Sequence, residues 1–178
     1  MRRLTAEPKA GSFNPGDSPL LETNNRIIVE LLDQQFDRLI ESLRALTVST
    51  PSNLLYEQHA ASSIGENILK SAGVIEQTFG GITANLWDDP FEWTLPETLS
   101  TDARVVEYLA EVNSLKNRAF VSFTDDGMLL KLISIPSGKP CSLLELLLTT
   151  MLRASDYRGR AAATLKLLSG EDATRFII

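Results

Sequence analysis

The sequence predicts an all-α protein folded as a four-helix bundle. Four long segments repeat apolar side chains at three- and four-residue steps, which is the period of an amphipathic helix. The chain shows no internal repeat and no alternation of strand and helix patterns, so the four helices must cover one another's apolar faces. At 178 residues, with 43% hydrophobic and 22% charged residues, it has the size and composition of one globular domain.

The bundle is predicted over residues 23–170, between an N-terminal arm at 1–22 and a C-terminal tail at 171–178. The arm holds Pro8, Gly11, Pro15, Gly16 and Pro19, a density that does not sustain a helix. Its positive charge is not followed by an apolar stretch, so no secretory signal is expected.

The first helix is predicted from Asn24 to the residues before Pro51, because proline disfavours helix in the residue that precedes it. Its apolar stripe consists of Ile27, Ile28, Leu31, Leu32, Phe36, Leu39, Ile40, Leu43 and Leu46. The second helix is predicted to begin at Ser63, since Ser63 and Glu66 have the spacing of a capping box. Gly80 and Gly81 are predicted to end it.

A long loop is predicted over residues 84–100, containing both tryptophans, Trp87 and Trp93. The third helix follows from Ser100 or Thr101 to Phe123, with Val105, Leu109, Val112, Phe120 and Phe123 as its core positions. Residues 124–140 combine turn residues with an apolar stretch and predict a short irregular hairpin. The fourth helix is predicted from a second capping box at Ser142 to about Ser169.

Two of these helices carry short motifs. One is the Ser63-Ile64-Gly65-Glu66 entry to the second helix, and the other is Tyr157-Arg158-Gly159-Arg160 in the fourth. Together they resemble the motif helices of the DinB-like (YfiT-like) helical bundles, whose members often read His-Arg-Gly-Gln at the second place. The resemblance covers residues 24–170 and implies the DinB-like topology, with a long crossover after the second helix. Members of this family are often dimers, so the resemblance also implies a homodimer.

In that family, three histidines from the two motif helices commonly bind a divalent metal. By the resemblance these positions fall at Lys70, Arg153 and Tyr157, and the chain has a single histidine, His59. Lysine and arginine are cations, whereas metal ligands must be neutral or anionic. We therefore expect no metal of this type and no cofactor.

Lys70, Arg153 and the Tyr157 hydroxyl could instead bind the carboxylate or phosphate of a small anionic ligand. The alternative is that these side chains are solvent-exposed or paired with Glu66 and Asp156. The helical wheel favours the alternative for Lys70, which falls nearly opposite the apolar stripe of its helix.

The composition also limits the choice of partner and compartment. A net charge of −6 argues against a nucleic-acid partner, and no apolar run has the length of a membrane helix. A single cysteine, Cys141, cannot form a disulfide within the chain, which favours a cytoplasmic location. His59 lacks a nucleophile nearby in the sequence and is read as a loop residue.

The function expected from these features is a metal-free, dimeric protein that binds a small ligand or a partner. The alternative is a metal-independent or metal-altered enzyme related to the thiol-dependent transferases of the DinB-like family. Such an enzyme should have a pocket with polar groups converging near Lys70, Arg153 and Tyr157.

Overall fold

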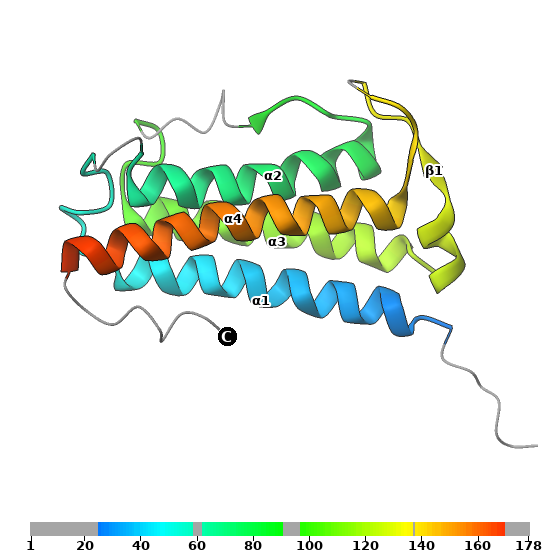
Figure 1. Cartoon of the computed structure of the whole chain (residues 1–178), viewed down its shortest axis with the longest axis horizontal. Helices are drawn as coiled ribbons and strands as arrows, with labels where there is room; N and C mark the ends of the chain where they lie inside the picture. Colours follow the sequence, from blue (N-terminus) through cyan, green and yellow to red (C-terminus); the bar gives the residue numbers. More distant parts are fainter. Residues whose placement is uncertain (1–24, 59–61, 91–96, 137, 170–178) are drawn as a thin grey trace, which may run out of the picture.

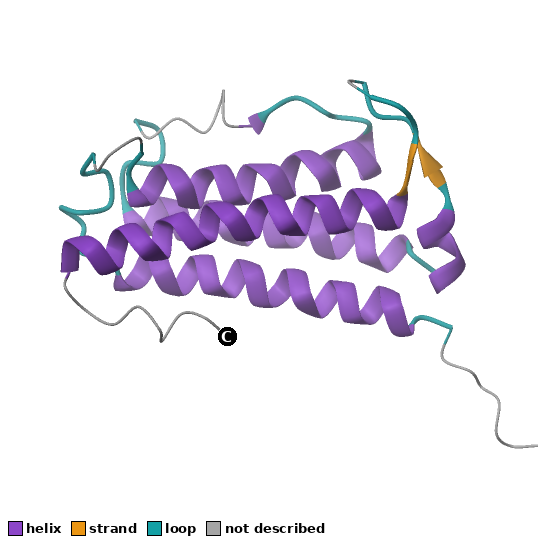
Figure 2. Cartoon of the chain, viewed as in Figure 1, coloured by secondary structure: helices purple, strands orange, loops and turns teal. Residues whose placement is uncertain are grey.

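The computed structural model describes residues 25–58, 62–90, 97–136 and 138–169, and within them it is the predicted all-α bundle (Figures 1 and 2). Its helices are α1 (Ile27–Ser49), α2 (Ile64–Ala84), α3 (Asp102–Ser122) and α4 (Leu143–Ser169). A 3₁₀ helix, η2 (Asp126–Leu130), and two short antiparallel strands, β1 (Leu132–Ile133) and β2 (Cys141–Ser142), separate α3 from α4. The predicted arm and tail lie outside the described residues.

The helices form a ring in the order α1, α3, α2, α4, with α2 packed most closely on α4. Figure 1 shows that α2 and α3 run in the same direction and that α1 and α4 run in the opposite one. Two parallel neighbours need a connection that returns along the bundle, and the segment between α2 and α3, described at residues 85–90 and 97–101, belongs to this crossover. The long loop between the second and third helices is thus confirmed.

Aromatic and small side chains fill the centre of the bundle. The rings of Phe36, Phe79 and Phe120 come from three different helices, and their centroids are 5.1 to 6.0 Å apart. Between α2 and α4 the Ser71 hydroxyl donates a 2.7 Å hydrogen bond to the carbonyl of Ala154. Small residues of this kind let the two helices approach closely.

The ends of the helices agree with the sequence except at one place. The capping box of α2 is present: the amide of Glu66 donates to the Ser63 hydroxyl, and the Ser63 amide donates to the Glu66 carboxylate. The prediction that Gly80 and Gly81 end this helix is wrong, because α2 continues to Ala84 and is capped by Asn85 in the left-handed conformation.

The N-terminal turn of α1 also differs from its predicted role. Ile27, Ile28 and Leu31 were expected in the core, but they are 62%, 45% and 52% exposed. The buried face of this turn passes through Val29 and Leu32, which leaves Ile27, Ile28 and Leu31 on its other sides. The Asp126 carboxylate of η2 caps the turn by accepting from the amides of Ile28 and Val29. The remaining predicted positions of this stripe, from Leu32 to Leu46, are buried.

The hairpin predicted over 124–140 is confirmed in a reduced form. Among the described residues of this segment, Leu132–Ile133 and Cys141–Ser142 pair as strands, and the preceding residues 126–130 form η2. The Ser142 hydroxyl accepts from the amide of Glu145, as expected for the start of α4.

Candidate functional site

A cavity lined wholly by described residues lies between α2 and α3. It encloses about 500 Å³, a volume typical of small-molecule sites. Its apolar walls come from Leu86, Pro90 and Leu115, and its charged groups are Glu76, Asp88 and Arg118. The cavity therefore offers apolar surface and a few charged side chains in one place.

The start of the crossover forms one wall of this cavity, and glycines in α2 allow it to do so. A Cβ at Gly81 would lie 2.3 Å from the Trp87 ring, so only glycine permits the indole to pack there. The Gln77 side chain donates a 2.8 Å hydrogen bond to the carbonyl of Trp87. These contacts hold the segment that carries Leu86 and Asp88 against the helix.

A second, smaller cavity of about 260 Å³ adjoins the first, and Glu76 lines both. The Tyr108 hydroxyl donates a 2.5 Å hydrogen bond to Oε2 of Glu76. Among the described residues the other carboxylate oxygen, Oε1, has no hydrogen-bond partner. We call the two cavities together the Glu76 cleft.

The far end of the crossover closes the smaller cavity. Leu99 lines it, and the carbonyl of Leu99 accepts a hydrogen bond from the Tyr56 hydroxyl. Tyr56 lies against the first turn of α2, where a Cβ at Gly65 would be 2.4 Å from its ring. Burial of the phenol, and then the negative charge of Glu66, raise the pKa of Tyr56 to about 12.

The Glu76 cleft carries more negative than positive charge. Four carboxylates line it against two guanidiniums, which leaves an excess of two negative charges; the side chains are Glu76, Asp88, Glu107, Glu111, Arg104 and Arg118. One of the guanidiniums, that of Arg104, also donates to the carbonyl of Thr98. Electrostatically the cleft suits a cation.

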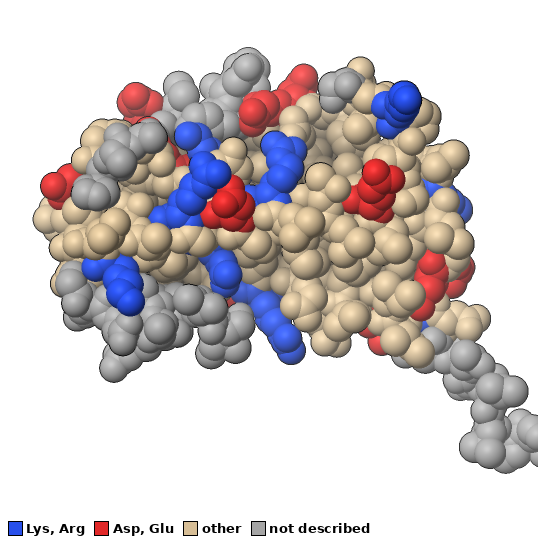
Figure 3. Space-filling model, in the orientation of Figure 1, with Lys and Arg blue, Asp and Glu red and all other residues tan. Residues whose placement is uncertain are grey.

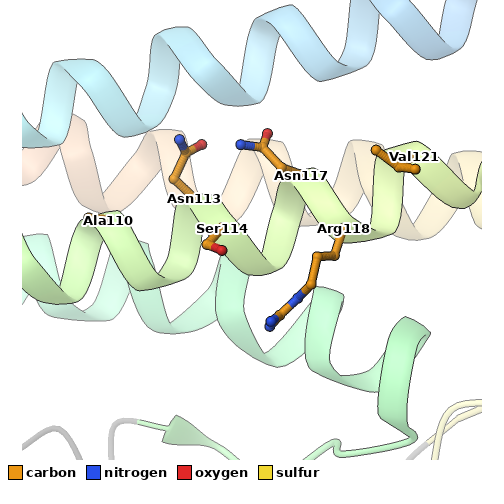
Figure 4. Close-up of a pocket in the computed structure, with 6 residues that line it drawn as sticks. All are labelled: Ala110, Asn113, Ser114, Asn117, Arg118 and Val121. Carbon is orange, nitrogen blue, oxygen red and sulfur yellow. The ribbon is translucent and has the colours of Figure 1, made fainter.

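A third hollow, of about 420 Å³, is lined by residues of α3 alone (Figure 4). Asn113 and Asn117 extend from the helix on the side of α1, whereas Arg118 extends on the side of α2. Because a single helix lines this hollow, it lacks the facing wall that would enclose a ligand. We therefore interpret it as a shallow depression in the surface beside the Glu76 cleft and not as a binding site.

A buried ion-pair cluster joins α1 and α3, and the sequence analysis did not foresee it. Lys116 is fully buried, and its Nζ lies 2.5 Å from the carboxylates of both Asp33 and Asp37. The ammonium also lies 5.6 Å from the centroid of the Phe120 ring. The two aspartates reach the surface, so the cluster has a buried cationic end and a hydrated anionic end.

The three residues predicted to bind an anion lie on the helices that pack most closely. Lys70 and Arg153 immediately precede the hydrogen-bonded pair Ser71 and Ala154, which places them at one level of the α2–α4 interface. Lys70 is half-buried, Arg153 is exposed and Tyr157 is half-buried. None of the three lines the Glu76 cleft or the hollow on α3.

Two side chains near Arg153 and Tyr157, those of Asp156 and Arg160, contact each other. Asp156, a predicted partner of Arg153, instead forms a 2.6 Å ion pair with Arg160. The Arg160 guanidinium also lies 5.4 Å from the centroid of the Tyr157 ring. Anion binding by Lys70, Arg153 and Tyr157 stays a prediction.

An ammonium, a guanidinium and a phenol do not fit a divalent metal ion. In the part of the chain that the structure describes, no three histidine, cysteine or acidic side chains come together as a metal site. His59 and Trp93 lie outside these residues. Cys141 is half-buried in β2 with its thiol free.

No protein-family model matches the chain, and no curated protein matches it. The resemblance to the DinB-like bundles therefore remains a prediction that these comparisons do not test. None of the helices in the described ranges is long and apolar enough to cross a membrane.

Proposed function

We propose that this protein binds a small organic cation, an amine with an apolar body, in the Glu76 cleft. The observation that carries the proposal is the position of Glu76, whose carboxylate lines both cavities and keeps Oε1 without a partner among the described residues. A protonated amine would form a charge-assisted hydrogen bond with this oxygen. Leu86, Pro90 and Leu115 would cover the apolar body.

Isothermal titration calorimetry with phenethylamine, and with the uncharged phenethyl alcohol as its analogue, tests this proposal. We expect the amine to bind with a Kd on the order of 0.1–1 mM and the alcohol to bind at least tenfold more weakly. Glu76→Gln should weaken amine binding about tenfold, since its amide can still accept from Tyr108 but carries no charge. Equal binding of amine and alcohol would refute the proposal.

Glu41→Gln is the matched control, because Glu41 is an exposed carboxylate of α1 and does not line the Glu76 cleft. It removes the same charge from the molecule as Glu76→Gln does. If both variants weaken the amine equally, the effect is one of net charge and the cleft is not the site.

We also propose that the protein is a homodimer and resides in the cytoplasm. Support for the dimer comes from exposed apolar side chains on α1 and α4, including Leu31, Leu148 and Leu152. Figure 3 shows that few charged groups cover the face over the N-terminal half of α4. Light scattering should report a dimer, and Leu152→Glu should convert it to a monomer. A monomeric wild type would refute the proposed dimer.

The single cysteine supports the cytoplasmic location. Cell fractionation tests this location.

A further inference from the structure

A small polar notch lies on the opposite edge of the bundle, at the seam between α1 and α4. It encloses about 160 Å³. Six residues line it, three from each helix: Gln35, Arg38, Leu39, Met151, Ser155 and Arg158. Two guanidiniums, one amide and one hydroxyl therefore face a common space that is smaller than the usual site for an organic molecule.

Both arginines of the notch lack an acceptor. Neither Arg38 nor Arg158 forms a hydrogen bond or an ion pair with another residue in the described part of the chain. The Nε of Arg158 is buried without a partner, which is rare for an arginine nitrogen. Two neighbouring carboxylates pair with other cations, Asp37 with Lys116 and Asp156 with Arg160.

The α4 side of the notch is basic. After Leu152, the described part of α4 carries Arg153, Arg158, Arg160 and Lys166 against a single acid, Asp156. Figure 3 shows basic side chains along this half of α4 and at its border with α1. The net charge of −6 does not oppose an anion here, because charges beyond about 8–10 Å are screened at physiological ionic strength.

We propose that this notch binds the phosphate group of a small molecule. Guanidinium groups match tetrahedral oxyanions with paired N–H donors, and Arg38 and Arg158 supply two such groups from two helices. Gln35 and Ser155 supply further donors to the remaining oxygens. The volume admits the phosphate itself, so any organic part of the ligand lies outside the notch. This site is separate from the Glu76 cleft and does not depend on it.

Isothermal titration calorimetry of inorganic phosphate into the full chain, at constant ionic strength, tests the proposal. We expect saturable binding with a Kd on the order of 1 mM and competition by sulfate. Arg38→Gln should weaken phosphate at least tenfold, and since Arg38 is exposed this variant should fold. Arg158→Gln should weaken it to a similar extent.

Two control variants separate this site from simpler explanations. Arg44→Gln removes the same charge from the exposed surface of α1, and it should change the Kd less than twofold. Arg153→Gln removes an arginine of the other predicted anion site. Absence of saturable phosphate binding by the wild type would overturn the proposal. So would equal weakening by Arg38→Gln and Arg44→Gln, or weakening by Arg153→Gln alone.

Glycerol 3-phosphate identifies the source of the phosphate group. Binding as tight as that of inorganic phosphate, and equally sensitive to Arg38→Gln, supports a phosphomonoester whose organic part projects from the notch. Binding of inorganic phosphate alone, with the same sensitivity, supports a site for the free ion. If glycerol 3-phosphate binds but Arg38→Gln does not weaken it, the notch is not the site.

Discussion

Replacing both Asp33 and Asp37 with asparagine should destabilise the fold far more than replacing Lys116 with methionine. All three side chains belong to one cluster, and both Nζ to carboxylate distances are 2.5 Å. Their exposure differs sharply, because the Lys116 side chain is 0% exposed whereas those of Asp33 and Asp37 are 36% and 53% exposed. The outcome therefore depends on which charge is left behind and whether water can reach it.

The double asparagine variant leaves an ammonium in the interior beside the Phe120 ring, with only neutral amides as acceptors. Stranding a buried charge costs about 3–5 kcal/mol. Lys116→Met leaves two hydrated carboxylates and retains most of the packing of the lysine stem. The remaining aspartates repel each other at a four-residue spacing by a few tenths of a kcal/mol. We expect the lysine variant to lie within about 1 kcal/mol of the wild type.

Urea unfolding followed by circular dichroism measures these differences. For a chain of this size, about 3–5 kcal/mol corresponds to a fall in Tm of roughly 6–20 °C. Glu41→Gln on the same helix should stay within about 0.5 kcal/mol of the wild type, since it touches no such cluster. If Lys116→Met proves as destabilising as the double asparagine variant, unequal burial does not govern this cluster.

Four further predictions concern three glycines of the helices and the half-buried phenol of Tyr56. Gly65→Ala should cost about 1–3 kcal/mol, because its Cβ would lie 2.4 Å from the Tyr56 ring and 2.9 Å from the carbonyl oxygen of Leu55. No atom lies within 4 Å of a Cβ built at Gly159, so Gly159→Ala should instead raise the free energy of unfolding by about 0.4–1 kcal/mol. Urea unfolding in which Gly65→Ala is the more stable of the two variants would contradict both predictions. Gly81→Ala should displace the Trp87 ring, so that in a Trp93→Phe background the fluorescence of Trp87 shifts to longer wavelength. The same variant should weaken phenethylamine binding severalfold. Unchanged binding would show that the contact between Gly81 and Trp87 does not shape the cleft. The raised pKa of Tyr56 favours the protonated phenol in the folded state, so its contribution is complete below pH 10 and is lost as the pH rises from about 10 to about 12. Between pH 9 and 11 the wild type should therefore lose about 1 kcal/mol more than Tyr56→Phe, after allowance for solvent screening, and equal losses in urea unfolding would count against it.

Most of the fold could be predicted from local patterns in the sequence. The helical period located all four helices, and the capping box at Ser63 marked the start of α2 correctly, because its hydrogen bonds join residues three apart. The end of α2 was predicted wrongly, because a glycine can either end a helix or make room for a neighbouring side chain. Gly81 reads as a terminator, but here it lies within the helix and makes room for Trp87, a contact that only the folded chain reveals.

The buried lysine did leave a signal in the sequence. Lys116 follows Val112 by four residues and precedes Phe120 by four, which places it in the apolar stripe of α3. Asp33 and Asp37, also four apart, share one face of α1. A charge inside a stripe could have been read as a buried ion pair, although its partners on another helix could not have been chosen without the packing of α1 against α3.

The two proposed binding sites left no comparable signal, because each is made by helices that meet only in the folded chain. Glu76 and Tyr108 are 32 residues apart, and the notch joins residues near 38 to residues near 158. The prediction at Lys70, Arg153 and Tyr157 came instead from a resemblance to motifs on two helices. That resemblance pointed to the α2–α4 interface, whereas the larger cavity of the Glu76 cleft lies between α2 and α3 and the notch lies between α1 and α4.

The ring order of the helices relates the two sites to one another. Since the order is α1, α3, α2, α4, the edge between α2 and α3 lies opposite the edge between α1 and α4. The acidic Glu76 cleft occupies the first edge, and the notch of Arg38 and Arg158 occupies the second. The net charge of −6 does not show that the linings of the cleft and of the notch have opposite signs, because a sum over the chain carries no information about position. The two edges lie on opposite sides of the bundle, and ions in solution screen their charges from one another beyond about 8–10 Å. An amine at one edge and a phosphate at the other should therefore bind without competing, and failure of one site would leave the argument for the other intact.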